Sequence, residues 1–437
     1  MASLVTGELI TPRSREYDQV RRNHDGYPPR SPAVIVRPRT EAEVGRVVLW
    51  AQEYALPLAV RSGGHCQART SVIDGGAVLD LAALRRITVD PSTRTASAGT
   101  GLRVGQYAAT VDAFGLATGF GEAGGVGLGG ITLGGGIGHL SRLNGLTVDH
   151  VLAARIVTAD GVVREIDQET EPDLFWAVRG GGGNFGVVTR FTYRLHPMGP
   201  LTQVRLRLPL TGSVLRRLID AALDAPEEVF VMFDAARSTG ADGRPAVEVT
   251  VCFAGVQSEA GTALRPFRAN LPIMAESVAC LRYPDLLARG DRADRPIEVG
   301  RALLADAIDD DAIDTIVEGV AGAVARTARF NLRRLGGRMA RVPARATAFA
   351  HRNRGWTGWV SATGATPDEA ADHEPWAADL AEVVATDRAA YVNSLGDEGP
   401  DRVRAAYPGS TWDRLRLIKR VYDPENVFRH NQNVPPR

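Results

Sequence analysis

The sequence has almost no lysine, little cysteine and no net charge. Its 437 residues include one lysine, Lys419, so nearly all of its basic side chains are arginines. Lysine and arginine together number 51 and are balanced by 51 acidic residues, which gives no support for nucleic acid or an anionic membrane as a partner. The three cysteines, Cys66, Cys252 and Cys280, show no paired spacing, which argues against a disulfide framework and against a metal site.

Long apolar runs are missing as well. The first residues, MASLVTGELITPRSREYD, lack the charged-then-apolar pattern of a secretory signal, and no apolar run is long enough to span a bilayer. We therefore expect a cytoplasmic protein with no membrane partner. The chain is too long for one simple core, so its length predicts two domains or one large split domain.

Glycine, by contrast, is abundant, and much of it is clustered. One cluster, GGVGLGGITLGGGIG, spans 124–138, a second spans 180–186, and Gly63-Gly64 follows a predicted strand. Glycine lets the backbone adopt positive φ, and consecutive free N–H groups form a nest that fits phosphate oxygens. We expect the first cluster to be neither helix nor strand, and both clusters to hold a dinucleotide diphosphate. The alternative is that the glycines only make tight turns and close packing.

Two common nucleotide-binding motifs do not fit these clusters. Neither cluster has the strand–GxGxxG–helix context with an acidic residue about twenty positions later, so a nicotinamide Rossmann site is poorly supported. A Walker loop is absent because no lysine follows the glycines. Any diphosphate would therefore be held mainly by backbone dipoles.

A histidine stands on the shortest glycine turn. Residues 33–61 predict a strand, a helix that begins with a capping box, and a second strand, and Ser62-Gly63-Gly64-His65 ends this β-α-β unit. A neutral imidazole is a good nucleophile, which makes His65 a candidate for covalent chemistry. The alternative is a hydrogen-bonded structural histidine. We expect Cys66 to be a small packed thiol.

The sequence changes character after about residue 196. Strands with alternating apolar residues, such as 247–251, mix with helices such as 311–324, which predicts an α+β region built on an antiparallel sheet. A helix is expected over 413–422. The closing NVFRHNQNVPP is too specific for a frayed end, so we expect it to pack back on the first domain.

Four blocks of the sequence resemble the berberine-bridge-enzyme-like oxidases of the vanillyl-alcohol-oxidase superfamily, and they occur in that family's order. The blocks are RSGGHCQARTS, GGVGLGGITLGGGIGHLSRLNGLTVDHV, PDLFWAVRGGGGNFGVVTRF and YDPENVFRHNQNVPP. Together they bracket nearly the whole chain. The middle, from about 201 to 388, resembles the family more weakly, except at GRMARVPARATAFAHR and, just beyond it, YVNSLGDEG.

The resemblance implies an α+β fold with an FAD-binding domain in two parts. Residues 1–200 would form its larger part and residues 391–437 would return to it. An antiparallel substrate domain over 201–390 would be inserted between them. The implied cofactor is FAD, without a metal ion.

The resemblance also implies how the flavin is attached. The motif histidine bonds the flavin 8α methyl in this family, which points to His65. Many relatives have a second link through a cysteine at the position of Ala123, so a single covalent bond is expected here. Val126 falls where the family admits or blocks dioxygen, and valine there goes with oxidase behaviour. The cofactor-binding residues implied are Arg61, Ser62, Gly63, Gly64, His65, Cys66, Gly125, Val126, Gly129, Gly130, Gly134, Gly135, Gly138, His139, Gly186, Val187, Val188, Asn431 and Asn433.

Oxidation of a C–OH or C–N carbon by hydride removal needs a base for the heteroatom proton. Some relatives carry a glutamate on the strand after the His351-Arg352 pair, but this stretch reads GWTGWVSATG. Tyr391 matches the first position of the family's Tyr-x-Asn-aromatic element, and Ser394 replaces its aromatic residue. We expect Tyr391 to be a base or substrate positioner, or else a packed strand tyrosine. Trp356 and Trp359 are expected on one strand face, as a substrate wall or as core.

These features predict an FAD-linked oxidase that takes a hydride from a small organic substrate and passes the electrons to dioxygen, giving hydrogen peroxide. The substrate would be an alcohol, a saccharide or a secondary-metabolite intermediate. Oxidative cyclisation of a phenolic or amine natural product is the alternative within this class. A flavin-loaded ligand-binding protein without turnover and a nicotinamide-dependent reductase are alternatives from other classes. No oligomeric state is predicted.

Overall fold

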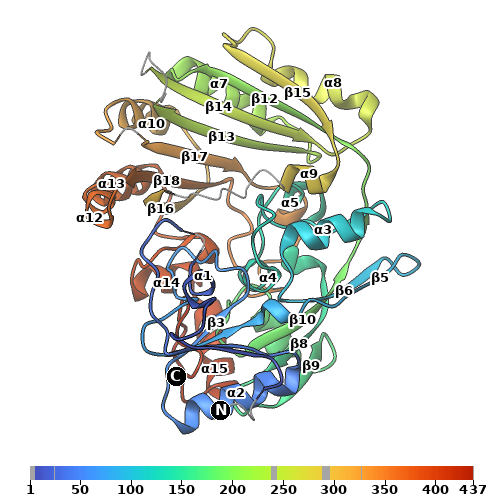
Figure 1. The fold of residues 1–437 in the computed structure, drawn as a ribbon. Helices are drawn as coiled ribbons and strands as arrows, with labels where there is room; N and C mark the ends of the chain where they lie inside the picture. The colour runs from blue at the N-terminus through green and yellow to red at the C-terminus, as the bar shows by residue number, and fades with distance from the viewer. Residues whose placement is uncertain (1–4, 24, 238–243, 288–295, 326, 437) are drawn as a thin grey trace.

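The computed structural model describes residues 5–23, 25–237, 244–287, 296–325 and 327–436. Figure 1 shows two parts stacked on each other: the N-terminal half and the C-terminal helices form the lower part, and one broad sheet with its helices forms the upper part. The predicted fold class is confirmed, because the antiparallel sheet lies between the two chain segments that build the lower part. No helix in the described ranges is long and apolar enough to cross a bilayer.

The lower part begins with a four-stranded sheet, and the turn that carries His65 follows one of its strands. Strands β2 (Val34–Arg37) and β3 (Leu58–Arg61) both pair in parallel with β4 (Ala77–Asp80), which lies between them, and β1 (Glu8–Ile10) adds an antiparallel edge. The predicted β-α-β unit is therefore present, although its two strands are not neighbours. Helix α2 (Glu41–Glu53) buries its apolar stripe against this sheet.

Helix α2 begins as the sequence predicts, with one difference. The Thr40 side chain accepts the N–H of Glu43, as in a capping box. The Glu43 carboxylate, however, accepts the N–H groups of Arg39 and Thr6 rather than that of Thr40. The cap thereby also fastens the N-terminal segment to the first sheet.

A five-stranded antiparallel sheet completes the core of the lower part, in the order β5-β6-β10-β8-β9. Helix α3 and helix α6 pack beside it, and the short strands β7 and β11 pair with each other. The bounds are β5 (Ile87–Asp90), β6 (Thr95–Gly99), α3 (Val104–Asp112), β7 (Leu116–Ala117), β8 (Val151–Val157), β9 (Val163–Asp167), α6 (Pro172–Val178), β10 (Val187–Arg194) and β11 (His196–Pro197). Two single-turn helices, α1 (Tyr17–Val20) and α5 (Ser141–Asn144), lie in the connections.

The long glycine cluster contains a helix, so the expectation that it is neither helix nor strand is wrong. Helix α4 (Leu128–Gly134) runs through its centre and ends at Gly135, whose φ is 131°. Glycine lowers intrinsic helix stability by about 1 kcal/mol per residue relative to alanine. Tertiary contacts offset this cost: Leu128 is fully buried, and the Thr132 hydroxyl bonds the Tyr193 hydroxyl at 2.8 Å.

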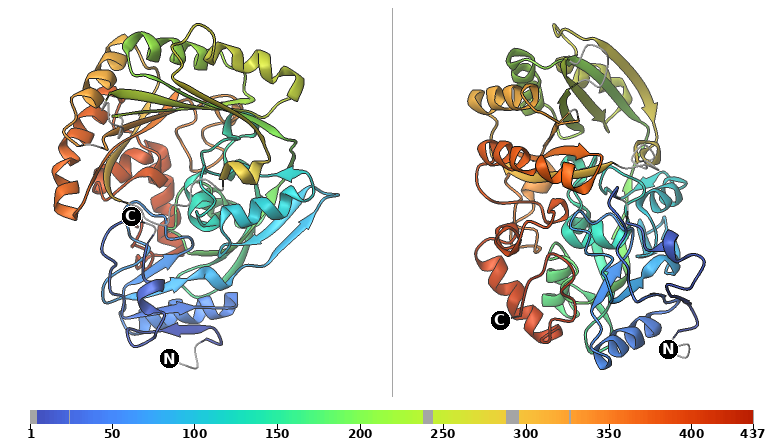
Figure 2. Two further views of the ribbon diagram at one scale, coloured as in Figure 1. Left: turned by 45° about the horizontal axis from the view of Figure 1, so that its top comes forward. Right: turned by 60° about the vertical axis from the view of Figure 1, so that its left-hand side comes forward.

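The upper part is a seven-stranded antiparallel sheet in the order β15-β12-β14-β13-β17-β18-β16. Most of its helices cover the face turned away from the lower part, as Figure 2 shows, whereas α9 and α11 pack against α3 and α5 of the lower part. The strands are β12 (Leu201–Pro209), β13 (Val229–Arg237), β14 (Pro245–Phe253), β15 (Ala275–Leu281), β16 (Ile297–Ala305), β17 (Arg329–Arg334) and β18 (Trp356–Gly364). The helices are α7 (Gly212–Leu223), α8 (Ala260–Leu264), α9 (Tyr283–Leu287), α10 (Asp310–Ala321), α11 (Arg338–Arg341), α12 (Pro367–Asp372) and α13 (Glu374–Val384).

Alternation along the strands gives this sheet two different faces. Every second residue packs under the helices in an apolar core. The other face is polar and turns toward the lower part, and it includes Asp234, Thr250, Asn331 and Ser361, all buried. Phe230 and Cys252 on this face join the hydrophobic core of the lower part, which fixes the two parts together.

The chain returns to the lower part through α14 (Pro400–Ala406) and α15 (Ser410–Tyr422), as the sequence predicts. The single lysine, Lys419, holds this returning segment in place through hydrogen bonds. Lys419 Nζ donates to the Asp423 carboxylate at 2.6 Å and to the carbonyls of Asn184 and Phe428 at 2.7 and 3.1 Å. Both charged side chains are fully buried. Burial lowers the pKa of Lys419, and the adjacent Asp423 carboxylate opposes that shift.

Replacing Lys419 with methionine should destabilise the protein strongly, because it leaves the buried Asp423 carboxylate without its cation. We expect the free energy of unfolding to fall by about 3–5 kcal/mol. Arg420→Met, one residue on at the exposed side of α15, should change it by less than about 0.5 kcal/mol. Urea unfolding of both variants measures the difference. Equal stabilities would show that the pair does not hold the C-terminal segment.

Candidate active site

The turn after β3 is packed backbone to backbone against the loop before α4. A Cβ built on Gly63 would lie 2.1 Å from the backbone nitrogen of Gly127, and one built on Gly127 would lie 2.2 Å from that of Gly63. Ser62 joins the same contact, because its hydroxyl donates to the Thr100 carbonyl at 2.6 Å and accepts the N–H of Gly129 at 3.3 Å. Only glycine fits at both positions, so the two motifs form one structure.

The backbone at this contact offers free hydrogen-bond donors. Within the part of the chain that the structure describes, the N–H groups of Gly64, Val126 and Gly127 donate to no protein acceptor. Gly64 has φ 73°, which turns its peptide planes as a nest requires. Three N–H groups from two adjoining loops fit a diphosphate, which is the group predicted for this place.

Two arginines flank the turn. The Arg61 guanidinium donates to the carbonyls of Val20 and Arg22 and lies against Gly64, where an added Cβ would come within 3.1 Å of Arg61 Nε. Arg103 donates to the carbonyls of Gly63 and Gly125. Arg103 was not predicted from the sequence, because it stands at the start of α3, outside every glycine cluster.

His65 and Val126 come together through the Gly63–Gly127 contact. Each of the two lies within two residues of a contacting glycine, and both are partly buried. The Val126 carbonyl accepts the N–H of Val104 at 2.8 Å, which fixes the loop. Cys66 Sγ lies 3.3 Å from the Thr70 hydroxyl, which suits the small packed thiol that the sequence predicts. The predicted cofactor contacts of these residues remain predictions.

The other glycines of the first cluster have different tasks. Gly130 is exposed, with nothing within 4 Å of an added Cβ, so a ligand could approach it. Gly134 lies against the Asn393 side chain, and Gly135 lies against the rings of Phe349 and Tyr391. Because these two glycines have no side chain, the C-terminal segment can pack closely against the end of α4.

The second glycine cluster mainly supports packing. The N–H groups of Gly180 and Gly182 both donate to the Leu133 carbonyl, and that of Gly181 donates to the Ala177 carbonyl. These three groups are therefore used within the protein and do not form a phosphate nest, contrary to our expectation for this part of the cluster. Gly186, with φ 152°, lies against the Val157 carbonyl at the start of β10.

The remaining cofactor predictions from this region concern backbone positions. Val187 and Val188 are buried in the core of the lower part, so they could meet a ligand only through their backbone. Asn431 Nδ2 donates to the carbonyls of Gly183 and Phe428, which places the Asn-Gln-Asn ending beside the second glycine cluster. The Oδ1 atoms of Asn431 and Asn433 are buried and accept no hydrogen bond within the described residues.

Tyr391 lies at the C-terminal end of α4. Its hydroxyl accepts the Gly136 N–H and the Asn393 side-chain N–H, both at 2.9 Å, and its ring meets Phe349 edge-on with centroids 5.9 Å apart. It precedes a 3₁₀ turn and does not lie in a strand, but it is packed as that alternative expects, because it is buried in an apolar cluster with Phe349. Burial raises the pKa of Tyr391, and the two donated hydrogen bonds oppose that rise.

His139 lies at the junction of the two parts. Gly138 fits against the Phe120 carbonyl, at 1.8 Å from an added Cβ, and this places the His139 ring 4.6 Å from the ring of Phe230 on β13. Burial lowers the pKa of His139, which keeps it neutral near pH 7. An ion pair between Glu122 and Arg333, at 2.5 Å, joins the same two parts.

The polar face of the upper sheet carries acidic groups that the sequence analysis missed. β18 has no carboxylate, as the sequence indicates, but neighbouring strands have them. Asp234 accepts hydrogen bonds from Arg329 Nε and Asn331 Nδ2 at 2.8 and 2.6 Å. Glu298 accepts the indole N–H of Trp359 at 2.9 Å. The alternation of polar and apolar residues along β13 and β17 is the signal that could have revealed this face.

The expectation that Trp356 and Trp359 share a strand face is wrong. Successive residues of a strand point to opposite faces, so two residues three positions apart also point to opposite faces. Trp356 is fully buried in the core under the helices, and Trp359 lies on the polar face. Only Trp359 could border a substrate.

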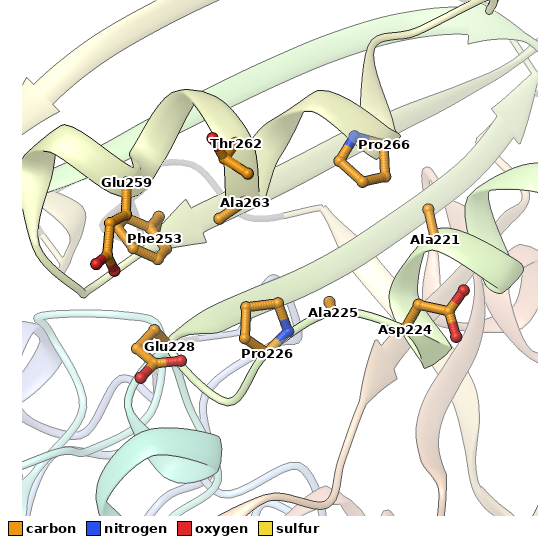
Figure 3. A pocket seen from close by; sticks show the side chains of 10 residues that line it. All are labelled: Ala221, Asp224, Ala225, Pro226, Glu228, Phe253, Glu259, Thr262, Ala263 and Pro266. Carbon is orange, nitrogen blue, oxygen red and sulfur yellow. The ribbon is translucent and has the colours of Figure 1, made fainter.

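A separate pocket of about 460 Å³ lies on the helix-covered side of the upper sheet. Figure 3 shows its walls, which combine the carboxylates Asp224, Glu228 and Glu259 with the ring of Phe253. None of the residues that form the glycine loops or the polar face lines it. Among the described residues there is also no group of His, Cys, Asp and Glu side chains that could hold a metal ion.

Comparisons with known proteins identify the two segments that build the lower part. Residues 32–167 match the family described as "FAD binding domain", and residues 390–435 match "Berberine and berberine like". Both segments contribute to the contacts at α4 that are described above. The glycine turns and free N–H groups fit the diphosphate of FAD.

Three relatives extend the match to the whole chain. The (R)-6-hydroxynicotine oxidase of Paenarthrobacter nicotinovorans is 30% identical over 99% of this chain and 97% of its own. The xylooligosaccharide oxidase of Thermothelomyces thermophilus is 28% identical over 93% and 88%. The crystal structure of 6-hydroxy-D-nicotine oxidase from Arthrobacter nicotinovorans superposes with a TM-score of 0.90, at 27% identity over 99% and 98%. The chain therefore belongs to the berberine-bridge-enzyme-like family of FAD-linked oxidases and is an FAD-dependent oxidoreductase.

Proposed function

We propose that the protein binds FAD covalently through His65 by a single link and oxidises a small organic molecule with dioxygen as electron acceptor. The observation that carries this proposal is the group of free N–H donors at Gly64, Val126 and Gly127, directly beside His65. Bound FAD would supply the chemistry, by accepting a hydride and passing the electrons to dioxygen. Ala123 has no thiol for a second link.

The protein's own residues would bind the substrate and handle its proton. Tyr391 is the proposed base or substrate positioner: two N–H donors on its oxygen favour the phenolate, although burial disfavours it. Val126 sits on the loop next to His65, where a small side chain would leave room for dioxygen. Asp234 and Glu298 provide further carboxylates on the facing sheet.

The polar sheet face supports a hydroxylated substrate, such as an alcohol or saccharide. Asp234, Asn331 and Arg329 form a linked hydrogen-bonding group, and Trp359 offers an aromatic surface beside it. Planar polar groups next to one aromatic ring suit a molecule with many hydroxyls and apolar C–H faces. An amine or phenolic substrate is the second candidate, which the carboxylates Asp234 and Glu298 favour. Oxidative cyclisation would then be the reaction.

The covalent link is tested by acid precipitation. The wild-type precipitate should stay yellow, because the bond survives unfolding. His65→Ala should lose its colour to the supernatant, because only hydrogen bonds and packing then hold the flavin. Absorbance of pellet and supernatant measures both, and Cys66→Ala is a matched control that should stay yellow. A white wild-type pellet with free FAD in solution would refute the covalent link.

Oxidase behaviour is tested by reoxidation in air after photoreduction. Wild type should reoxidise within seconds, and Val126→Leu should react about tenfold more slowly or worse, which equals about 1.4 kcal/mol in the barrier. Val126→Ala should stay fast. Flavin absorbance at its visible maximum follows the reaction. A wild type that stays reduced for many minutes would instead favour the ligand-binding protein without turnover, and bleaching by NADPH would favour a reductase.

The role of Tyr391 is tested with any substrate found in a peroxide-release screen over alcohols, sugars, amines and phenols. Tyr391→Phe should slow anaerobic flavin reduction by about 10²–10⁴-fold, the range for loss of a general base. Because burial raises the pKa of Tyr391, the wild-type rate should rise with pH on the alkaline side, as the phenolate forms. That rise should vanish in Tyr391→Phe. An unchanged pH profile would exclude Tyr391 as the base.

A further inference from the structure

We propose that Arg103 is a positioning residue of the diphosphate site, which holds its two loops together and turns their free N–H groups to one side. The inference rests on the assignment of FAD and goes beyond it, because Arg103 lies outside the glycine loops. It stands at the start of α3, in extended conformation with φ −92° and ψ 152°. Its side chain is exposed at the surface of the protein.

The contacts of Arg103 bridge the two motifs. One guanidinium nitrogen donates to the Gly63 carbonyl at 3.4 Å and to the Gly125 carbonyl. The backbone of Arg103 also forms an isolated β-bridge with Gly127, through which Val104 N–H donates to the Val126 carbonyl. A single residue therefore holds both loops, by side chain and by main chain.

These contacts decide which way the free N–H groups point. In a trans peptide the C=O of one residue and the N–H of the next point in opposite directions, and the described chain contains no cis peptide. The Gly63 carbonyl faces Arg103, so the Gly64 N–H points away from it. The Gly125 carbonyl also faces Arg103, so the Val126 N–H points away as well. Arg103 thereby turns two of the free donors to the opposite side of the loops.

The charges near the turn have both signs. Arg103 and Arg61 both donate to carbonyls, and neither forms an ion pair within the described ranges. Burial lowers the pKa of Arg61, the Asp80 carboxylate opposes that shift, and the charge of Arg103 adds to it. The Arg103 guanidinium lies on the carbonyl side of both loops, so it acts on a diphosphate through the orientation of the N–H groups and not by contact.

The test uses the His65→Ala background, in which flavin binds reversibly. Flavin fluorescence gives the affinity for FAD and for riboflavin, and displacement of FAD gives the affinity for ADP. Arg103→Gln should lower the affinities for FAD and for ADP by about 10- to 100-fold, and each tenfold loss corresponds to about 1.4 kcal/mol of binding free energy. Riboflavin has no phosphate, so its affinity should change by less than about twofold.

Two further variants sharpen the result. Arg103→Lys should recover part of the FAD affinity, because the lysine ammonium can still donate to carbonyls but lacks the fixed, planar geometry of the guanidinium. Arg194→Gln removes another exposed arginine, at the far end of β10 from Val187, and should leave all three affinities unchanged.

Three outcomes would overturn the inference. Equal losses for riboflavin and FAD would mean that Arg103 only supports the fold. Unchanged FAD affinity in Arg103→Gln would mean that it has no role at the site. Failure of the His65→Ala protein to bind FAD or ADP at all would refute the diphosphate site itself, and this result is separate from the outcome of the acid-precipitation test on wild type.

Discussion

The approach of Gly63 to Gly127 is the contact on which the site depends. Any side chain at either position would occupy the space of a backbone nitrogen, so the two loops can adjoin only as glycines. Their adjacency leaves N–H groups of both loops without acceptors among the residues that the structure describes, on either side of the same contact. Buried backbone donors normally find partners, so a cluster of free ones is the mark of a ligand site.

The C-terminal segment completes this arrangement from the opposite end of α4. Lys419 and Asp423 form a fully buried ion pair, and Lys419 also donates to the carbonyls of Asn184 and Phe428. The Asn-Gln-Asn ending begins three residues after Phe428. A buried pair adds little net stability over an apolar pair, but it is specific, because only one arrangement satisfies both charges. The use of the chain's single lysine for this purpose shows that it serves the fold rather than the chemistry.

The sequence predicted the parts of the site that depend on local residue type. Glycines that must approach a backbone, a histidine on a strand-ending turn and an alternating antiparallel region are all readable from spacing. It did not predict α4, because intrinsic propensity argues against a helix of LGGITLG, which is stabilised by the packing of its apolar side chains and the burial of Leu128 and Thr132. The sequence also could not distinguish Gly180 to Gly182, whose N–H groups donate to protein carbonyls, from glycines whose N–H groups have no protein acceptor among the described residues.

Arg103 and the polar sheet face escaped prediction for a different reason: their roles arise from contacts between distant segments. Arg103 lies forty residues from Gly63 and meets it because β6 ends beside the glycine turn, where the Thr100 carbonyl accepts the Ser62 hydroxyl. Asp234 and Asn331, 97 residues apart, adjoin through the pairing of β13 with β17. The cofactor site is thus built from short motifs, whereas the wall facing it is built from strand pairing. Residues of that wall can change without disturbing the glycine contact, which is the physical basis for one flavin scaffold serving different substrates.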